Sequence, residues 1–143
     1  MRLASYERSR TMALLHRFFR TALLVGRMPS LLGRDIFRMQ LQSPAAHAFE
    51  DSVLFVCDVE LCLRQLDPFD QRLIAFCVLE DRSEWQASRC FHMSQGEISR
   101  RLGHVLDLLH ETFCRVGLLP PLPEEFRNRP AESQKTTQGV RRC

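Results

Sequence analysis

Glycine and lysine are scarce in this 143-residue chain, and long apolar runs are absent. Six glycines and seven prolines exclude a collagen-like or low-complexity composition. The longest apolar stretch, residues 12–26, is interrupted by His16, Arg17 and Arg20, so it falls short of the roughly 18 residues that a membrane span requires. Charge also splits this stretch too early for a signal peptide, and Glu7 weakens a superficial likeness to a transit peptide. The remaining composition, 45% hydrophobic and 26% charged, is typical of one globular domain.

None of the six cysteines forms a C-x-x-C pair. All except Cys143 lie among apolar residues of expected helices, where cysteine behaves as a small hydrophobic residue. This usage predicts a reducing, cytoplasmic location without disulfides. A metal site is not expected, because histidine and cysteine do not recur at ligand spacing.

Positive charge is concentrated at the start of the chain. Lys135 is the single lysine, so basic residues are almost all arginine. Residues 1–45 carry eight arginines against two acids, whereas residues 46–118 carry seven arginines against twelve acids, and residues 119–143 are again slightly basic. This distribution excludes a uniformly basic coat for nucleic acid.

Apolar spacing predicts helices throughout and no convincing strand, which indicates an all-α fold. Residues 1–10 are expected to be frayed, and an amphipathic helix is expected from Thr11 to Gly26. Its Phe18–Phe19 face is expected to pack on the body, although its arginines also suit phosphates, an anionic surface or a dimer contact. A short helix at 31–41 and a longer one at 46–66 follow. The polar face expected for the 46–66 helix consists of Glu50, Asp51, Asp58, Glu60 and Arg64.

Three helix starts then come in succession. Asp67-Pro68 places an N-cap aspartate before a proline at the first helical position. Ser83-x-x-Gln86 and Ser94-x-x-Glu97 have the form of capping boxes, in which a side-chain oxygen at the cap satisfies amides that the helix cannot pair. We therefore predict helices at 68–80, 84–91 and 95–115. The chain after Leu119 is expected to be a disordered tail, in which Pro-Pro-Leu-Pro acts as a helix stop or, alternatively, as a polyproline ligand.

The last two helices have the lengths and spacing of a helix-turn-helix motif. The short first helix would contact phosphates, and the second would enter the major groove with its N-terminal residues nearest the bases. The apolar positions expected to hold the two helices together are Ala87, Phe91, Met93, Ile98 and Leu102.

The opposite face of the second helix carries side chains that suit DNA. Gln95 can pair with adenine, arginine with guanine, and Ser99 with phosphate or base, while Gly96 permits close approach of the backbone. Glu97 has two interpretations, as a capping-box partner and as a cytosine contact. Arg89 on the first helix is a phosphate candidate. The predicted DNA-binding set is Arg89, Ser94, Gln95, Gly96, Glu97, Ser99, Arg100, Arg101 and His104.

Residues 60–113 resemble region 4 of the sigma-70 family, the domain that contacts the −35 promoter element. The likeness is carried by Leu63-x-x-Leu66-Asp67-Pro68, Gln71-Arg72-Leu73-Ile74, Val78-Leu79-Glu80, Ser83-x-x-Gln86-Ala87-Ser88 and Ser94-Gln95-Gly96-Glu97-Ile98-x-Arg100-Arg101-Leu102. Where the family has a left-handed glycine in the turn, this chain has His92. The resemblance implies that residues 95–101 contact DNA and that the surface around 60–80 docks on RNA polymerase.

The sequence therefore predicts a DNA-binding transcription regulator with a basic helical segment (1–45), a region 4-like domain (46–118) and a tail (119–143). Residues 1–59 are too short for the promoter-melting region of a complete sigma factor. The acidic balance of residues 46–118 favours weak binding, since phosphate neutralisation supplies much of DNA affinity. The alternative is an adaptor that has kept the fold and lost DNA affinity. An enzyme is not expected, because no paired carboxylates, phosphate loop or Cys/His dyad lies at usable spacing, and no cofactor is implied.

Overall fold

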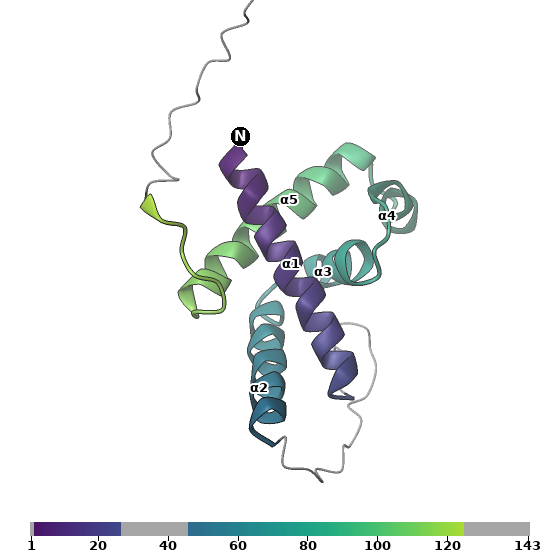
Figure 1. Ribbon diagram of the computed structural model, residues 1–143. Helices are drawn as coiled ribbons and strands as arrows, with labels where there is room; N and C mark the ends of the chain where they lie inside the picture. The colour runs from purple at the N-terminus through teal and green to yellow at the C-terminus, as the bar shows by residue number, and fades with distance from the viewer. Residues whose placement is uncertain (1, 27–45, 125–143) are drawn as a thin grey trace, which may run out of the picture.

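A computed structural model describes residues 2–26 and 46–124, and the secondary structure there is entirely helical (Figure 1). The elements are α1 (Arg2–Leu24), α2 (Ala46–Leu63), α3 (Pro68–Ile74), a π-helical segment η2 (Ala75–Leu79), α4 (Glu84–Phe91) and α5 (Gln95–Arg115). The all-α prediction is confirmed for these residues. The helix predicted at 31–41 lies outside them.

Helix α1 crosses the middle of α5, with α2 on one side of the crossing and α3, η2 and α4 on the other (Figure 1). The core fills the angles between these helices. Leu15, Phe18 and Ala22 of α1 are fully buried there, which confirms the inward face predicted for this helix, although Leu23 is 46% exposed. Phe18 is among the largest fully buried side chains, together with Phe113 of α5.

Residues 2–10, which were predicted to be frayed, are helical, because their side chains make hydrogen bonds with α5 and with the chain that follows it. Arg8 donates two hydrogen bonds to the carboxylate of Asp107, each 2.7 Å long. Thr11 lies 3.3 Å from His110 across the same contact, and Arg10 donates to the backbone carbonyl of Pro120. These partners lie about a hundred residues away in sequence, so local spacing at residues 2–10 carries no signal of them.

Helix α2 ends at Leu63, three residues before the predicted end, and Glu60 is buried rather than exposed. Both α1 and α5 pack against α2. The two neighbours together bury more of the α2 surface than a single neighbour on one amphipathic face would bury. Glu60 remains paired at its accessible edge, where Arg64 lies 3.8 Å from one carboxylate oxygen. The prediction failed because it assumed a single neighbour for this helix.

The 68–80 segment is two elements rather than one uniform helix. Its last turn, η2, is widened, so that the amide of Glu80 donates to the carbonyl of Ala75 five residues before it. Asp67 occupies the N-cap position with Pro68 after it, but its side chain makes no capping hydrogen bond. The carboxylate of Asp67 is directed at Arg101 instead, at 3.5 Å.

The first residues of the predicted tail pack on the body. The amides of Leu118 and Leu119 both donate to the carbonyl of Phe113, and both side chains are partly buried against the core. Gly117 makes this reversal possible with a φ of +81°, a conformation that favours glycine. The rest of the tail, residues 125–143, lies outside the described residues.

The five described cysteines are free thiols, as predicted. Cys62 and Cys77 are buried, and burial raises the pKa of the Cys77 thiol to about 11. Cys90, in contrast, is exposed, because it lies on the outer side of α4 rather than in the apolar contact that its neighbours suggested.

Candidate functional site

Helices α4 and α5 are joined by a tight turn that caps both of them. Ser83 and Ser94 each form a complete capping box, with Gln86 and Glu97 as the reciprocal partners. Between them His92 ends α4 in the left-handed conformation, with φ 56° and ψ 40°, and the amides of His92 and Met93 both donate to the carbonyl of Ser88. Both predicted capping boxes are confirmed, and His92 is left-handed at the position where the family has glycine.

The strain at His92 leads to a prediction about stability. Holding a residue with a side chain in the left-handed region costs about 1–2 kcal/mol. Glycine removes this strain, but part of the gain is lost because glycine gives up more backbone entropy on folding. We expect His92→Gly to raise the free energy of unfolding by about 0.5–1 kcal/mol in urea titrations. The control is His104→Gly, inside α5, where the same change should lower stability by about 1 kcal/mol. A loss of stability in both variants would contradict a strained turn.

An apolar contact fixes the angle between α4 and α5. Ala87 and Ile98 are fully buried and Leu102 is 9% exposed. Phe91 and Met93 are partly buried, and the Phe91 ring meets Phe69 edge-on at 5.4 Å and Phe76 at 5.6 Å between centroids. All five residues predicted to hold these helices together are thus buried or partly buried in the core, and the Phe91 ring adds contacts with α3 and η2.

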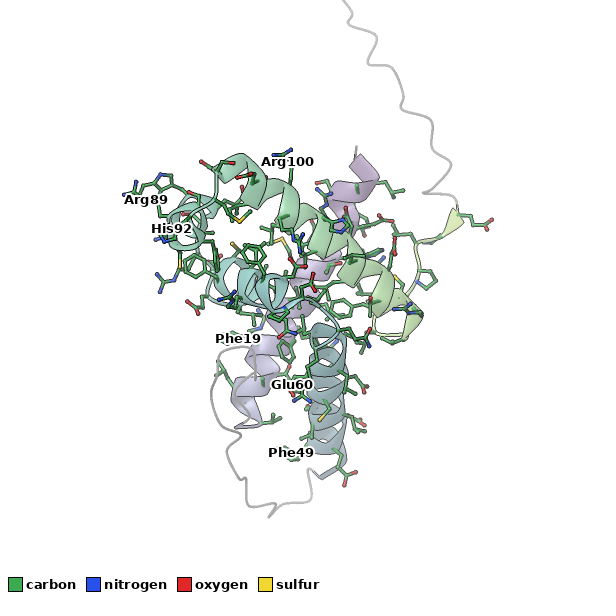
Figure 2. The ribbon with its side chains drawn as sticks, turned by 180° about the vertical axis from the view of Figure 1, so that it is seen from behind. Phe19, Phe49, Glu60, Arg89, His92 and Arg100 are labelled. Carbon is green, nitrogen blue, oxygen red and sulfur yellow. The ribbon has the colours of Figure 1, made fainter. Side chains whose placement is uncertain are left out.

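The first half of α5 presents a polar surface to solvent. Gln95, Gly96, Ser99, Arg100 and His104 are all exposed. Nothing lies within 4 Å of where a Cβ would stand at Gly96, so the backbone there is open to a ligand. Arg100 points away from the body at the upper edge of the molecule in Figure 2, and its Nε donates to the carbonyl of Gly96 at 3.3 Å.

Arg101 differs from its neighbour, because it faces inward. Its guanidinium donates to both carboxylate oxygens of Asp70, at 2.6 and 3.0 Å, and lies 3.5 Å from Asp67. The side chain of Asp70, which accepts these hydrogen bonds, is only 5% exposed. The hydrogen bonds to Asp70 raise the pKa of Arg101 above its ordinary value. Arg101 therefore ties α5 to the start of α3, and its charge is already neutralised.

Glu97 is occupied by its capping role. One of its carboxylate oxygens accepts from the amide of Ser94 at 2.9 Å and from the Ser94 hydroxyl at 2.8 Å. The hydrogen bond from the Ser94 amide, followed by that from the hydroxyl, holds the pKa of Glu97 below its ordinary value. The capping interpretation of Glu97 is thus confirmed, and Ser94 is engaged in the same box.

Arg89 lies at the outer end of α4, near His92 (Figure 2). It is exposed, and its guanidinium carbon is 5.4 Å from the centre of the Trp85 ring, which is itself 57% exposed. Stacking on an indole leaves the charge of an arginine available to an anion. Arg89 and Arg100 are therefore the two exposed cations that the α4–turn–α5 unit offers from the predicted set.

Sequence reasoning missed the polar contacts between α1 and α5. The guanidinium of Arg8 reaches Asp107 across Gly103, where an added Cβ would lie 2.9 Å from it and would make the arginine side chain shift. The hydrogen bonds from Arg8 lower the pKa of Asp107.

Cys114 and His110, both in α5, form a thiol–imidazole contact of 3.6 Å, although no such pair was expected from the sequence. Their i, i+4 spacing on one helix was the available signal.

The described residues offer no group of three or more His, Cys, Asp or Glu side chains arranged to hold a metal ion. Within the same ranges, no helix combines the length and apolar character needed to cross a bilayer. Family models, curated proteins and solved structures yield no match to this chain. The features of this chain that bear on function are therefore the geometry of α4, its turn and α5.

Proposed function

We propose that the protein is a DNA-binding transcription regulator in which α4, the turn at His92 and α5 act as a helix-turn-helix similar to that of sigma-70 region 4. The observation that supports this most is the combination of two capping boxes around a left-handed turn with a polar, exposed first half of α5. Helices α2 and α3, with η2, brace the unit from behind.

In this proposal α5 enters the major groove through its N-terminal two turns. Gln95 is positioned to pair with adenine and Arg100 with guanine, while Ser99 and the open backbone at Gly96 allow close approach. Arg89, at the outer end of α4, contacts a flanking phosphate. Ser94 and Glu97 set the start of α5 through the capping box, and Arg101 is paired with Asp70 of α3.

The experiment that tests the proposal is selection of a random duplex pool with the purified protein at low and moderate salt. We expect an enriched motif, and we expect Arg100→Ala to weaken binding to it by about tenfold, the usual effect of losing one good base contact. Binding is measured by fluorescence anisotropy across a salt series.

The matched control is Arg115→Ala, which removes the same charge from the exposed last residue of the same helix. It should leave the affinity within about twofold, because Arg115 lies roughly 22 Å further along α5. Equal losses in both variants would indicate general attraction to charge rather than recognition. No enrichment at either salt would sink the DNA-binding proposal.

A second candidate function is that of an adaptor without DNA affinity, and the outer face of α2 favours it. Leu54 and Leu61 lie seven residues apart on this face and are 60% and 57% exposed. Exposed acids, Glu50, Asp51 and Asp58, surround them. Such an apolar and acidic face suits contact with a protein, and the resemblance to region 4 makes RNA polymerase the first partner to test. Absence of duplex binding would favour this function.

A further inference from the structure

Two rows of exposed side chains lie side by side where α1 and α2 pack together. On α1, residues 13, 17, 20 and 24 recur at steps of four, three and four, which places them on one side of the helix. On α2, residues 51, 54, 58 and 61 recur at steps of three, four and three and also share one side. Every one of these side chains is exposed. The α1 row consists of Ala13, Arg17, Arg20 and Leu24, and the α2 row consists of Asp51, Leu54, Asp58 and Leu61.

The contact between Arg17 and Phe55 shows that the two rows belong to one surface. The guanidinium carbon of Arg17 lies 4.5 Å from the centre of the Phe55 ring, across the boundary between the helices. Phe55 comes four residues after Asp51 and three before Asp58, so it borders the α2 row on the side toward α1. The two helices run in opposite directions along this boundary (Figure 1). Together the rows form the α1–α2 face, which is basic along α1 and acidic along α2.

The charges of the α1–α2 face are not neutralised inside the part of the chain that the structure describes. Arg20, Asp51 and Asp58 form no ion pair with any residue of 2–26 or 46–124. Arg17 stacks on an aromatic ring, which leaves the charge of an arginine available to an anion. The face therefore offers cations and anions in two separate rows, both open to a partner.

Three leucines on the same face are strongly exposed. Leu24 is 82% exposed, Leu54 is 60% exposed and Leu61 is 57% exposed. Single exposed leucines are ordinary, whereas several of them among unpaired charges on one face are typical of a protein-binding surface. Exposed ion pairs add little affinity by themselves, so the leucines would supply the apolar area and the charges would set the orientation of the partner.

A second copy of this chain has the charges that match both rows. We propose that the protein forms a two-fold dimer in which the α1 row of each copy packs on the α2 row of the other, so that the four helices make a bundle. The symmetry axis runs parallel to these helices, between the two copies, and both copies use the same surface. Arg17 of one copy then stands at the level of Phe55 in the other, within about one turn of Asp51 and Asp58. This inference does not depend on DNA binding.

Charge excludes the other way of stacking two such faces. A two-fold axis in the same plane but perpendicular to the helices would place α1 on α1 and α2 on α2. Arg17 and Arg20 would then face their own copies, and so would Asp51 and Asp58. Like charges brought into contact oppose association, whereas complementary charges favour it, so the parallel axis is the one that satisfies both rows.

The test is a charge swap, with the dissociation constant of the dimer measured on the full chain by analytical ultracentrifugation. Arg17→Glu with Arg20→Glu reverses the α1 row and should raise this constant by about tenfold or more. Asp51→Arg with Asp58→Arg reverses the α2 row and should do the same. An equimolar mixture of the two double variants should form a heterodimer of nearly wild-type affinity, because each reversed row then meets a row of opposite charge. Recovery in the mixture also shows that neither variant has unfolded.

The matched control reverses Arg89 and Arg100, which lie on α4 and α5 at the opposite edge of the molecule from α2 (Figure 2). Arg89→Glu with Arg100→Glu changes the net charge as much as the α1 variant does and should leave the dissociation constant within about twofold. Equal weakening in this control, or a mixture of the two swapped variants that stays monomeric, would overturn the dimer.

The wild-type chain gives a further decisive outcome. If it is monomeric at every concentration, the dimer is overturned and the α1–α2 face is left to a different protein, as the adaptor function requires. If it is a dimer that responds to the charge swap but selects no duplex, this inference stands and the DNA-binding proposal fails.

Discussion

Phe18→Ala should lower the free energy of unfolding by about 3–5 kcal/mol, the usual cost of removing a fully buried phenyl ring. Phe18 is 0% exposed and belongs to the same core cluster as Val56 of α2 and Phe113 of α5. The cavity left by alanine would open in the core that α1 shares with α2, η2 and α5. The matched control is Phe19→Ala next to it, which should cost less, because Phe19 is only partly buried.

The measurement is urea unfolding followed both by circular dichroism and by the fluorescence of Trp85, the only tryptophan in the chain. Trp85 lies on α4, is 57% exposed and is not a member of the core cluster that contains Phe18. Since α1 shares one core with α5, both signals should shift to the same lower midpoint. A Trp85 transition that stays at the wild-type midpoint would show that α1 is not part of the cooperative unit.

Arg101→Ala should lower the free energy of unfolding by about 2 kcal/mol. The change leaves the carboxylate of Asp70, only 5% exposed, without its two hydrogen bonds. Removing one partner of a fully buried pair costs about 3–5 kcal/mol, and the smaller figure reflects the 39% exposure of the Arg101 side chain. Arg100→Ala, one residue away, should change stability by no more than about 0.5 kcal/mol.

A double-mutant cycle separates the ion pair from other effects of the substitution. Arg101→Ala combined with Asp70→Ala should be more stable than the sum of the two single changes predicts, because no unpaired carboxylate remains. Folded Arg101→Ala should also bind the selected duplex nearly as well as wild type. An Arg101→Ala variant of wild-type stability that has lost DNA binding would restore the sequence-based assignment of Arg101 to the DNA-binding set.

The starts of α3, α4 and α5 were predictable because their determinants are local, whereas the π-helical segment η2 was not predicted. Ser83 and Ser94 each lie three residues before the partner that completes the capping box, so sequence spacing alone placed the starts of α4 and α5. The left-handed residue at His92 stands where the sigma-70 resemblance implies a glycine, so the resemblance and not the spacing indicated it. The apolar contact of Ala87, Ile98 and Leu102 followed from the 3.6-residue period, which needs no knowledge of the remaining chain.

Local sequence patterns were enough to predict the order of the helices, the capping boxes of α4 and α5 and the apolar side of the contact between them. Tertiary structure alone decided that residues 2–10 are helical, that Glu60 is buried and that Arg101 faces Asp70 while Arg100 faces solvent. The physical reason is the separation of the partners: Arg101 and Asp70 are 31 positions apart in the sequence, and Arg8 and Asp107 are 99 positions apart. Adjacent arginines have the same local signal, and only the packing of α5 on α3 gives them different roles.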